Sequence, residues 1–467
     1  MSVIAVVGAQ WGDEGKGRVV DYLADDADLV IRYGGGNNAG HTVVNPHGHF
    51  KLHLIPSGIF HPRTRNLLGN GVVINPPALV AEIENLARAG FDAANLFISD
   101  RAHVVMPYHV LLDQLEERER GADKLGTTAR GIGPAYVDKV ARRGIRIVDL
   151  MEADAFRARL DAALAKVRRQ VDACVEAIGA DDELEATVAE AMDPRTIAEA
   201  YLAAAETLRR HVVDGQAMVD EALERGERIL LEGQLGTMRD LDWGIYPYVT
   251  SSSPIPGGAS IGAGLPAVAI DQVLGVAKAY TTAVGAGPLP TELNDADGEA
   301  LRARGVEYGT STGRARRCGW YDAVAVRFSV RLAGYSSIAL TKLDVLDGFD
   351  RIRIGTAYRD PVEEREWTTV PASASVYERL EPVYEELPGW QADTTACRSW
   401  GDLPEGARTY VERLEALAGV PISHVSVGPE RAQMIVRAVA SRRHAGVSRP
   451  PVPMPAARAR GGSEVAS

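Results

Sequence analysis

Short apolar runs alternate along most of the chain with stretches whose apolar positions repeat at helical spacing. Residues 3–7 are uniformly apolar and rich in β-branched side chains, which predicts a buried strand, and residues 29–31 form a second such run. The segment from Val19 predicts a helix start, and residues 77–89 carry apolar positions at helical spacing. This alternation predicts an α/β fold with a large central, mostly parallel β-sheet, surrounding helices and ligands at the carboxyl ends of the strands.

Two long segments depart from this alternation. Residues 152–225 are rich in Ala, Glu and Arg, and breaks at Gly179 and Pro194 divide them into helices, so we expect a helical insertion with a packing role. Residues 446–467 are rich in Pro, Ala, Arg and Gly, a composition typical of disorder. We therefore predict one catalytic domain over residues 1–445, followed by a disordered tail.

Composition narrows the class of protein. The chain has 467 residues, 46% of them hydrophobic, and a formal net charge of −12, which argues against nucleic acid or an anionic membrane as a partner. No segment approaches the roughly 20 consecutive apolar residues that a membrane helix needs. The cysteines, Cys174, Cys318 and Cys397, are widely spaced, so they give neither a disulfide framework nor a metal cluster and fit a reducing cytoplasm.

The stretch from Gly8 to Arg18, GAQWGDEGKGR, has the form of a phosphate-binding loop between a strand and a helix. Glycines and a helix N-terminus favour anion binding, and Lys16 adds a full positive charge. The spacing is not that of the standard P-loop, and Gly17 follows the lysine where a hydroxyl would hold magnesium. Asp13 is the obvious replacement because its oxygens suit Mg²⁺. The alternative for this stretch alone is a glycine-rich turn with solvated charges.

A second glycine-rich stretch, residues 32–42, follows the strand at 29–31 and contains His41. Beside a phosphate loop, this histidine can donate a proton or a hydrogen bond to a transferring phosphoryl group. A lone histidine is more often a structural hydrogen-bonding group, which remains the alternative.

Three further loops carry groups suited to anions. Residues 124–134 combine Thr127, Thr128 and Arg130 with glycines, and a basic cluster follows at 139–146. Residues 246–253 offer a row of hydroxyls. Three arginines between 314 and 317 are suited to clamping carboxylates or phosphates. The alternatives are a solvated basic face, an ordinary Ser/Thr loop and a nucleic-acid patch, the last disfavoured by the net charge.

Lys342 and Asp344 follow a predicted strand at residues 337–340. An aspartate in this position can accept the two N–H donors of guanine, a pair that adenine lacks, so the sequence favours a guanine nucleotide. Residues 426–428 follow another strand and offer a further loop at a strand end.

Taken together, these stretches resemble the adenylosuccinate synthetase family. The matching pieces, in the family's order, are residues 12–18, 38–41, 130–134, 139–144, 246–252, 284–288, 314–320 and 341–344. The resemblance implies a purine-biosynthetic ligase that joins L-aspartate to IMP with GTP and Mg²⁺. The products would be adenylosuccinate, GDP and phosphate, formed through a 6-phosphoryl-IMP intermediate. A cytoplasmic homodimer is also implied.

The resemblance assigns roles to individual residues. Asp13 is expected to take the N1 proton of IMP, and His41 to act as a general acid on the phosphoryl group. Asp13 and the Gly40 carbonyl are the expected metal ligands, and Arg142 is expected to reach IMP in the neighbouring subunit. The expected GTP contacts are Gly12, Glu14, Gly15, Lys16, Gly17, Arg18, Gly40, Thr42, Arg316, Lys342, Leu343, Asp344, Ser426, Val427 and Gly428. The expected IMP contacts are Asp13, Lys16, Asn38, Ala39, Gly40, His41, Thr128, Arg142, Gln234, Thr250 and Arg314. The expected L-aspartate contacts are Thr310, Ser311, Thr312, Gly313, Arg314 and Arg316.

One departure from the family's pattern bears on the purine. Residues 233–237, predicted to be a loop, read GQLGT where the family usually reads GAQGT, so Leu235 stands where the IMP-contacting glutamine is expected and Gln234 comes one place earlier. Two alternatives follow: a related ligase that joins aspartate to another purine nucleotide such as dGMP, and a GTP-binding protein without ligase chemistry. Asp13 favours IMP over the first, because such relatives tend to lose this aspartate. The arginine clamp argues against the second.

Overall fold

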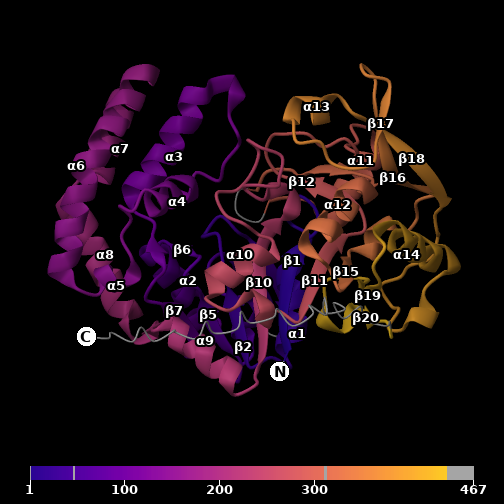
Figure 1. Ribbon diagram of the computed structural model, residues 1–467, viewed down its shortest axis with the longest axis horizontal. Helices are drawn as coiled ribbons and strands as arrows, with labels where there is room; N and C mark the ends of the chain where they lie inside the picture. The colour runs from indigo at the N-terminus through magenta and orange to yellow at the C-terminus, as the bar shows by residue number, and fades with distance from the viewer. Residues whose placement is uncertain (1, 46–47, 310–312, 439–467) are drawn as a thin grey trace, which may run out of the picture.

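A ten-stranded sheet forms the centre of the computed structural model, which describes residues 2–45, 48–309 and 313–438 (Figure 1). Its strands lie in the order β20 (Met434–Val436), β19 (Ile422–Ser426), β15 (Ser337–Thr341), β11 (Gln272–Lys278), β1 (Ser2–Gly8), β10 (Arg228–Gly236), β2 (Leu29–Arg32), β5 (Arg65–Leu68), β7 (Leu96–Ser99) and β9 (Val212–Val213). All neighbours in this order are parallel except β19 and β20. The predicted α/β fold with a mostly parallel sheet is confirmed.

Helices cover both faces of this sheet, which explains why its strands read as continuous apolar runs. One hydrophobic cluster packs β1, β10, β11 and β15 against α9 (Gly215–Glu224), α10 (Pro256–Ala263), α12 (Ala323–Ala333) and α14 (Glu405–Ala418). A smaller cluster packs the other face against α1 (Lys16–Ala24). The central strand β1 is thereby shielded from water on both sides.

The helical part of the chain stands at one side of the sheet, where α6 packs against α3 and α8, and α7 packs against α3 (Figure 1). Its helices are α2 (Pro76–Arg88), α3 (Pro107–Arg120), α4 (Ile132–Val140), α5 (Ile147–Leu150), α6 (Ala153–Ile178), α7 (Asp182–Ala191) and α8 (Pro194–Leu208). The expected breaks are present, because α6 ends before Gly179 and α8 begins at Pro194. The insertion also supplies β9, which pairs with β7 and was not predicted.

The opposite side carries smaller elements (Figure 1). They comprise the sheet of β14 (Tyr321–Asp322), β16 (Arg351–Asp360), β17 (Arg365–Trp367) and β18 (Glu381–Pro388), the pair β12 (Thr281–Ala283) and β13 (Arg317–Gly319), and the helices α11 (Ala296–Gly305) and α13 (Ala374–Arg379). Two further strand pairs lie elsewhere: β3 (His41–Asn45) pairs with β4 (Gly48–Leu52) near α1, and β6 (Val73–Ile74) pairs with β8 (His103–Val104) against α4 on the helical side. In the described ranges, no helix is both long and apolar enough to cross a membrane.

One local prediction was wrong. Residues 233–236, predicted to be a loop, belong to β10. Opposite Val6 to Gly8 of β1, the partner strand advances from Glu232 to Gly236, so β10 carries a bulge. The sheet therefore continues to the level of the phosphate loop and holds residues 233–236 close to it.

Candidate active site at the carboxyl ends of the strands

The loop between β1 and α1 closes around the carboxylate of Glu14. Glu14 is fully buried, and its Oε1 accepts hydrogen bonds from the backbone N–H groups of Gln10 at 3.0 Å and Gly12 at 2.9 Å. Its Oε2 accepts a bond from Lys16 Nζ at 2.6 Å. The left-handed backbone of Gly12 and Gly15 permits this tight turn. The loop thus has the N–H donors of an anion-binding site, and the carboxylate of Glu14 occupies these donors.

Asp13, at the tip of this loop, contacts Arg316. Its carboxylate, 29% exposed, accepts a hydrogen bond from Arg316 Nε at 2.6 Å on Oδ2. The same guanidinium donates to Glu307 at 2.7 Å. The phosphate loop and the arginine-rich loop therefore meet, although they are far apart in the sequence.

His41 lies against the start of α1 and is held by a buried carboxylate. A Cβ on Gly17 would come 2.7 Å from the Cβ of His41, so only glycine allows this approach. The Nδ1 of His41 lies 2.6 Å from Oε1 of Glu232, and Glu232 also accepts bonds from the hydroxyl and N–H of Ser57. Burial alone would raise the pKa of Glu232, but His41 and Ser57 hold it below its ordinary value. The carboxylate orients the ring and leaves Nε2 to serve a substrate.

The strand ends on the other side of β1 present a second polar group. Lys342 has a left-handed backbone, and its Nζ contacts Glu307 at 2.7 Å and the Gly305 carbonyl at 2.6 Å. Burial raises the pKa of Asp344, and its Oδ1 is buried without a hydrogen-bond partner among the described residues. An acceptor with an unsatisfied oxygen is suited to the N–H donors of a guanine base.

Arg18, in α1, connects this helix to the loop that follows β19. Its guanidinium donates to the hydroxyl of Ser426 and, at 2.7 Å, to the Glu430 carbonyl. Burial lowers the pKa of Arg18 to about 10, against the opposing effect of Asp344. Ser426 and Val427 are fully buried, and Gly428 follows them. The loop after β19 is thereby fixed beside the phosphate loop.

The bulge in β10 separates Gln234 from Leu235. Gln234 is 2% exposed, lies over Gly35 and donates from Nε2 to the Ser252 hydroxyl at 3.1 Å. Leu235 has a left-handed backbone and lies over Gly12. The bulge therefore directs the glutamine toward the glycine-rich stretch at 32–42 and the leucine toward the phosphate loop.

The loop at 124–131 is tied to Arg314, whose guanidinium donates to the carbonyls of Gly126 and Thr127 at 3.2 and 3.0 Å. In this loop the N–H groups of residues 125–127 donate to Glu117 of α3, so these three donors are not presented to an anion. Arg314 and Thr128, two expected IMP contacts, are thereby brought to one loop cluster.

Thr250 is held in the same region by Arg239. The Thr250 N–H donates to the Arg239 carbonyl at 2.8 Å. The Arg239 guanidinium donates to the carbonyls of Tyr248 and Val284 at 2.6 and 2.7 Å. Thr250 is therefore fixed by backbone contacts that link two of the motif-bearing loops.

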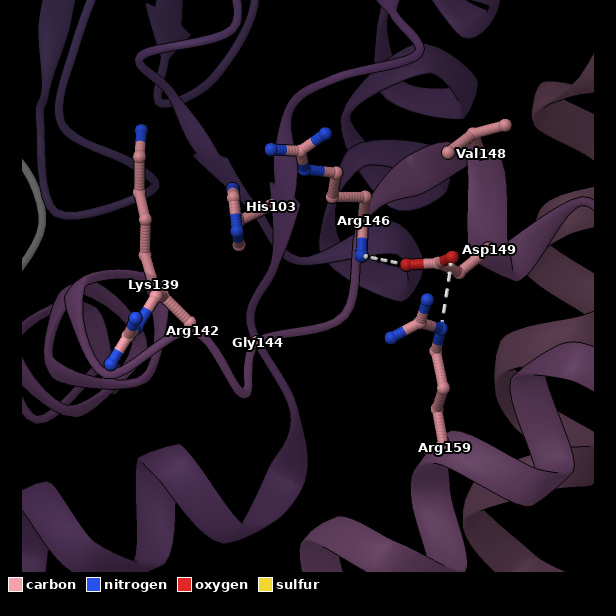
Figure 2. A pocket seen from close by; sticks show the side chains of 8 residues that line it. All are labelled: His103, Lys139, Arg142, Gly144, Arg146, Val148, Asp149 and Arg159. Carbon is pink, nitrogen blue, oxygen red and sulfur yellow. Dashed lines mark hydrogen bonds and ion pairs between the residues drawn. The ribbon is translucent and has the colours of Figure 1, made fainter.

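Arg142 lies outside the group of loops at the strand ends. Its side chain is exposed and lines a cavity of about 440 Å³ (Figure 2). The other lining residues are His103, Lys139, Gly144, Arg146, Val148, Asp149 and Arg159, and none of them belongs to the strand-end loops of β1, β10, β11, β15 or β19. Figure 2 shows the Arg142 guanidinium near Lys139, away from the Asp149–Arg159 pair. The cavity has a cationic lining with one carboxylate.

The remaining expected contact residues lie next to the residues described above. Asn38, Ala39, Gly40 and Thr42 surround His41, and the Asn38 side chain accepts a bond from the Gly36 N–H at 3.1 Å. Leu343 is buried beside Lys342, and Gly313 is exposed beside Arg314. Thr310, Ser311 and Thr312 lie outside the described residues. Sequence reasoning missed Glu232 and Glu307; the signal for Glu232 was a charged residue at the end of an apolar strand.

Comparisons with known proteins agree over nearly the whole chain. A sequence model of the adenylosuccinate synthetase family matches residues 5–435. The adenylosuccinate synthetase of Heliobacterium modesticaldum is 52% identical over 435 residues, which cover 93% of this chain and 99% of the relative. The Brevibacillus brevis enzyme of the same name is 50% identical over 436 residues, with the same two coverages.

Two solved structures extend the comparison. Fully ligated adenylosuccinate synthetase from Plasmodium falciparum aligns with a TM-score of 0.86 and 35% identity, covering 94% of this chain and all of that one. Cyanophage S-2L succinoaminodeoxyadenylate synthetase, bound to dGMP and dATP, aligns with a TM-score of 0.56 and 19% identity, covering 93% of this chain and 95% of that one. The second likeness concerns the fold alone.

Proposed function

This chain belongs to the adenylosuccinate synthetase family, and from that premise we propose how its residues carry out the reaction. The chain is a GTP-dependent ligase of purine biosynthesis that joins L-aspartate to IMP, giving adenylosuccinate, GDP and phosphate. The alternative substrate dGMP is not favoured, because the relatives that are half identical to this chain are adenylosuccinate synthetases.

Asp13 is the proposed base of the first step. The O6 of IMP is a poor leaving group, so it must first be phosphorylated. Removal of the N1 proton by the Asp13 carboxylate makes O6 a nucleophile, which attacks the γ-phosphorus while GDP leaves. The amine of L-aspartate then displaces phosphate from C6 of 6-phosphoryl-IMP. The exposure of Asp13 at the tip of the phosphate loop supports this role.

His41 and Lys16 are proposed to stabilise charge on the transferring phosphoryl group. The contact between His41 and Gly17 puts the ring beside the N-terminus of α1, where anions are favoured. The carboxylate of Glu232 contacts Nδ1 and orients the ring, so that Nε2 is available to act as a general acid on the phosphoryl group. Lys16 Nζ donates one hydrogen bond to Glu14, and the two other donors of its ammonium group can serve phosphate oxygens.

The residues at the loop fit a magnesium ion. Among the described residues, no group of three or more His, Cys, Asp or Glu side chains gathers as a metal cage. A single carboxylate, Asp13, with the Gly40 carbonyl fits Mg²⁺, which usually takes one or two protein carboxylates together with phosphate oxygens. When bound, the ion neutralises phosphate charge.

The three substrates are assigned to neighbouring loops. For guanine we propose Lys342, Asp344 and residues 426–428, supported by the unsatisfied oxygen of Asp344. For IMP we propose Asn38, Thr128, Gln234 and Thr250 with Arg314, and for L-aspartate the loop from Thr310 to Arg316.

The Arg142 side chain is proposed to reach IMP of a second subunit in a homodimer, because it lines a separate, cationic cavity. The free cysteines support a cytoplasmic location.

The experiment that tests the base is adenylosuccinate formation with GTP, Mg²⁺, L-aspartate and IMP by the chain and by Asp13→Asn. We expect the variant to lose at least about 10²-fold in kcat, the usual contribution of a general base, while it still binds GDP. Turnover at the original rate would overturn the assignment.

For the homodimer, mixing Asp13→Asn with Arg142→Leu chains should restore activity, because mixed dimers then contain one intact site. No recovery on mixing would contradict the shared site.

A further inference from the structure

Glu307 lies at the base of the loop that carries Gly313 and Arg314, and its side chain is fully buried. Its Oε1 accepts hydrogen bonds from Lys278 Nζ at 2.9 Å and Lys342 Nζ at 2.7 Å, and from the Tyr280 hydroxyl. Its Oε2 accepts a bond from the Arg316 guanidinium at 2.7 Å. One carboxylate therefore collects three cations, from the ends of β11 and β15 and from the arginine-rich loop.

The negative charge of Glu307 offsets part of the positive charge of the three side chains that surround it. Burial alone would raise the pKa of Glu307, but Lys278, Lys342 and Arg316 together hold it well below its ordinary value, so the group is ionised. Burial lowers the pKa of Lys278 to about 8. Without Glu307, three positive charges would face one another in a poorly solvated site, and the flexible Lys342 and Arg316 side chains would separate.

The backbone of Glu307 also closes the loop. The Arg316 N–H donates to the Glu307 carbonyl at 2.9 Å, and the Glu307 N–H donates to the Arg302 carbonyl at 2.9 Å. Val306, just before it, has a left-handed backbone, which is unfavourable for a β-branched residue. The two arms of the loop around residues 308–315 are thus joined at Glu307.

The contacts of Arg316 link this carboxylate to the reacting groups. Arg316 is bound by Glu307 through one nitrogen and by Asp13 through another, at 2.7 and 2.6 Å. Arg316 therefore has one carboxylate partner on the phosphate loop and one in the buried cluster. Glu307 is the partner that also binds Lys342, so it fixes both side chains relative to each other.

We propose that Glu307 is a positioning residue that holds Arg316 and Lys342 in place for the reaction, and so connects the guanine side of the site to Asp13 and to the base of the 308–315 loop. The proposal rests on the proposed function, in which Asp13 reacts and Lys342 serves GTP. The competing explanation is a buried ion pair that contributes only to stability.

Steady-state kinetics of Glu307→Gln separates the two explanations. We expect KM for both GTP and L-aspartate to rise and kcat to fall, with kcat/KM about 10- to 100-fold lower, as when a group that orients binding residues is lost. Glu307→Asp keeps the charge and should recover part of the loss. A purely structural role would lower the fraction of folded enzyme, and hence kcat, with both KM values unchanged.

Asp360→Asn is the matched control. Asp360 is a fully buried carboxylate at the end of β16, paired with Arg379 at 2.7 Å, outside the strand-end site. We expect a lower thermal unfolding temperature with unchanged KM values. Kinetics for Glu307→Gln that match those of Asp360→Asn would overturn the proposal.

Tyr280→Phe keeps the test decisive if Glu307→Gln does not fold. It removes a single hydrogen bond to Glu307 and no charge, so we expect both KM values to rise together by about two- to fivefold, the cost of a modest hydrogen bond. Unchanged KM values would overturn the proposal. If Asp13→Asn keeps full turnover, the base assignment fails, while the ratio of KM values between Glu307→Gln and the unaltered chain still tests Glu307.

Discussion

The Nδ1 of His41 lies 2.6 Å from Oε1 of Glu232, a carboxylate with no exposed surface in the middle of β10. A ring nitrogen bonded to a buried carboxylate is fixed in orientation, and so is the other nitrogen of the ring. The phosphoryl-transfer role proposed for His41 therefore depends on a residue that does not itself touch substrate.

Glu232→Gln should lower kcat by about 10- to 100-fold, because the ring keeps a neighbour of the same shape but loses its negative partner. KM for IMP and GTP should change little, since Glu232 lies behind His41. Ser57→Ala is the control: it removes the hydroxyl bond to Glu232, 2.6 Å long, and keeps the charge. If both variants lose the same activity, packing rather than charge is responsible.

Asp344→Asn should change the nucleotide preference from GTP to XTP. The carboxylate suits the two N–H donors of guanine, whereas an amide offers one acceptor and one donor, which match N1–H and the C2 carbonyl of xanthine. We expect kcat/KM for GTP to fall by about 10- to 100-fold, the cost of a mismatched buried polar pair. Measurement of kcat/KM for both nucleotides checks this. A variant that loses GTP turnover without gaining XTP turnover would place the guanine elsewhere.

Gln234→Ala should raise KM for IMP by about tenfold with kcat nearly unchanged, the cost of one hydrogen bond to the nucleotide. The bulge in β10 supports this choice, since it directs Gln234 toward Gly35 and Ser252. Leu235→Ala serves for comparison and should leave KM for IMP close to its original value. A larger effect at Leu235 would mean that the leucine, and not the glutamine, faces the purine.

His103 should make the protein less stable in mild acid. Burial, followed by the nearby Lys139 and Arg146, lowers the pKa of His103 from 6.5 to about 4. Below pH 6.5 the unfolded chain binds a proton that the folded chain does not accept, so the free energy of unfolding falls as the pH drops from 6.5 to 4. Above pH 6.5 this contribution is complete and constant.

Denaturant unfolding of His103→Gln at pH 7, 5.5 and 4.5 checks this, because the variant should lose less stability over that range than the unaltered chain. His49→Gln, at an exposed histidine, should keep the original slope. Parallel slopes for the unaltered chain and His103→Gln would contradict the prediction.

The sequence predicted the sheet and the loops better than the contacts within them. Apolar runs such as residues 3–7 are sufficient to predict buried strands, because parallel strands are covered on both faces. Motif spacing likewise placed Asp13 and Lys342 after strands, which is where they lie in the fold, and singled out His41, which lies against the start of α1. It did not predict that Glu14 would occupy the donors of the phosphate loop, since that depends on the backbone angles of Gly12 and Gly15.

Contacts between distant segments were also beyond the sequence. From the sequence, Glu307 is an ordinary charged residue next to an arginine-rich loop. Glu232 is a charged residue at the end of a predicted strand. Their partners, Arg316 with Lys342 and His41 with Ser57, are brought together only by the sheet order. The bulge that turns Gln234 into the site needs the pairing of β10 with β1, which spacing along the chain does not reveal.

The order of strands in the sheet has a consequence for synthesis on the ribosome. β1 leaves the ribosome well before its two neighbours in the sheet, β10 and β11, which begin at Arg228 and Gln272. At about 5–20 residues per second, the nascent β1 waits on the order of ten seconds or longer with both edges unpaired and its apolar side chains uncovered. Such a segment is open to misassociation, so yield in the cell should depend on protection by chaperones during elongation. Ser426, one of the proposed guanine contacts, emerges later than β10 and β11, so a chain terminated before it lacks part of the proposed nucleotide site.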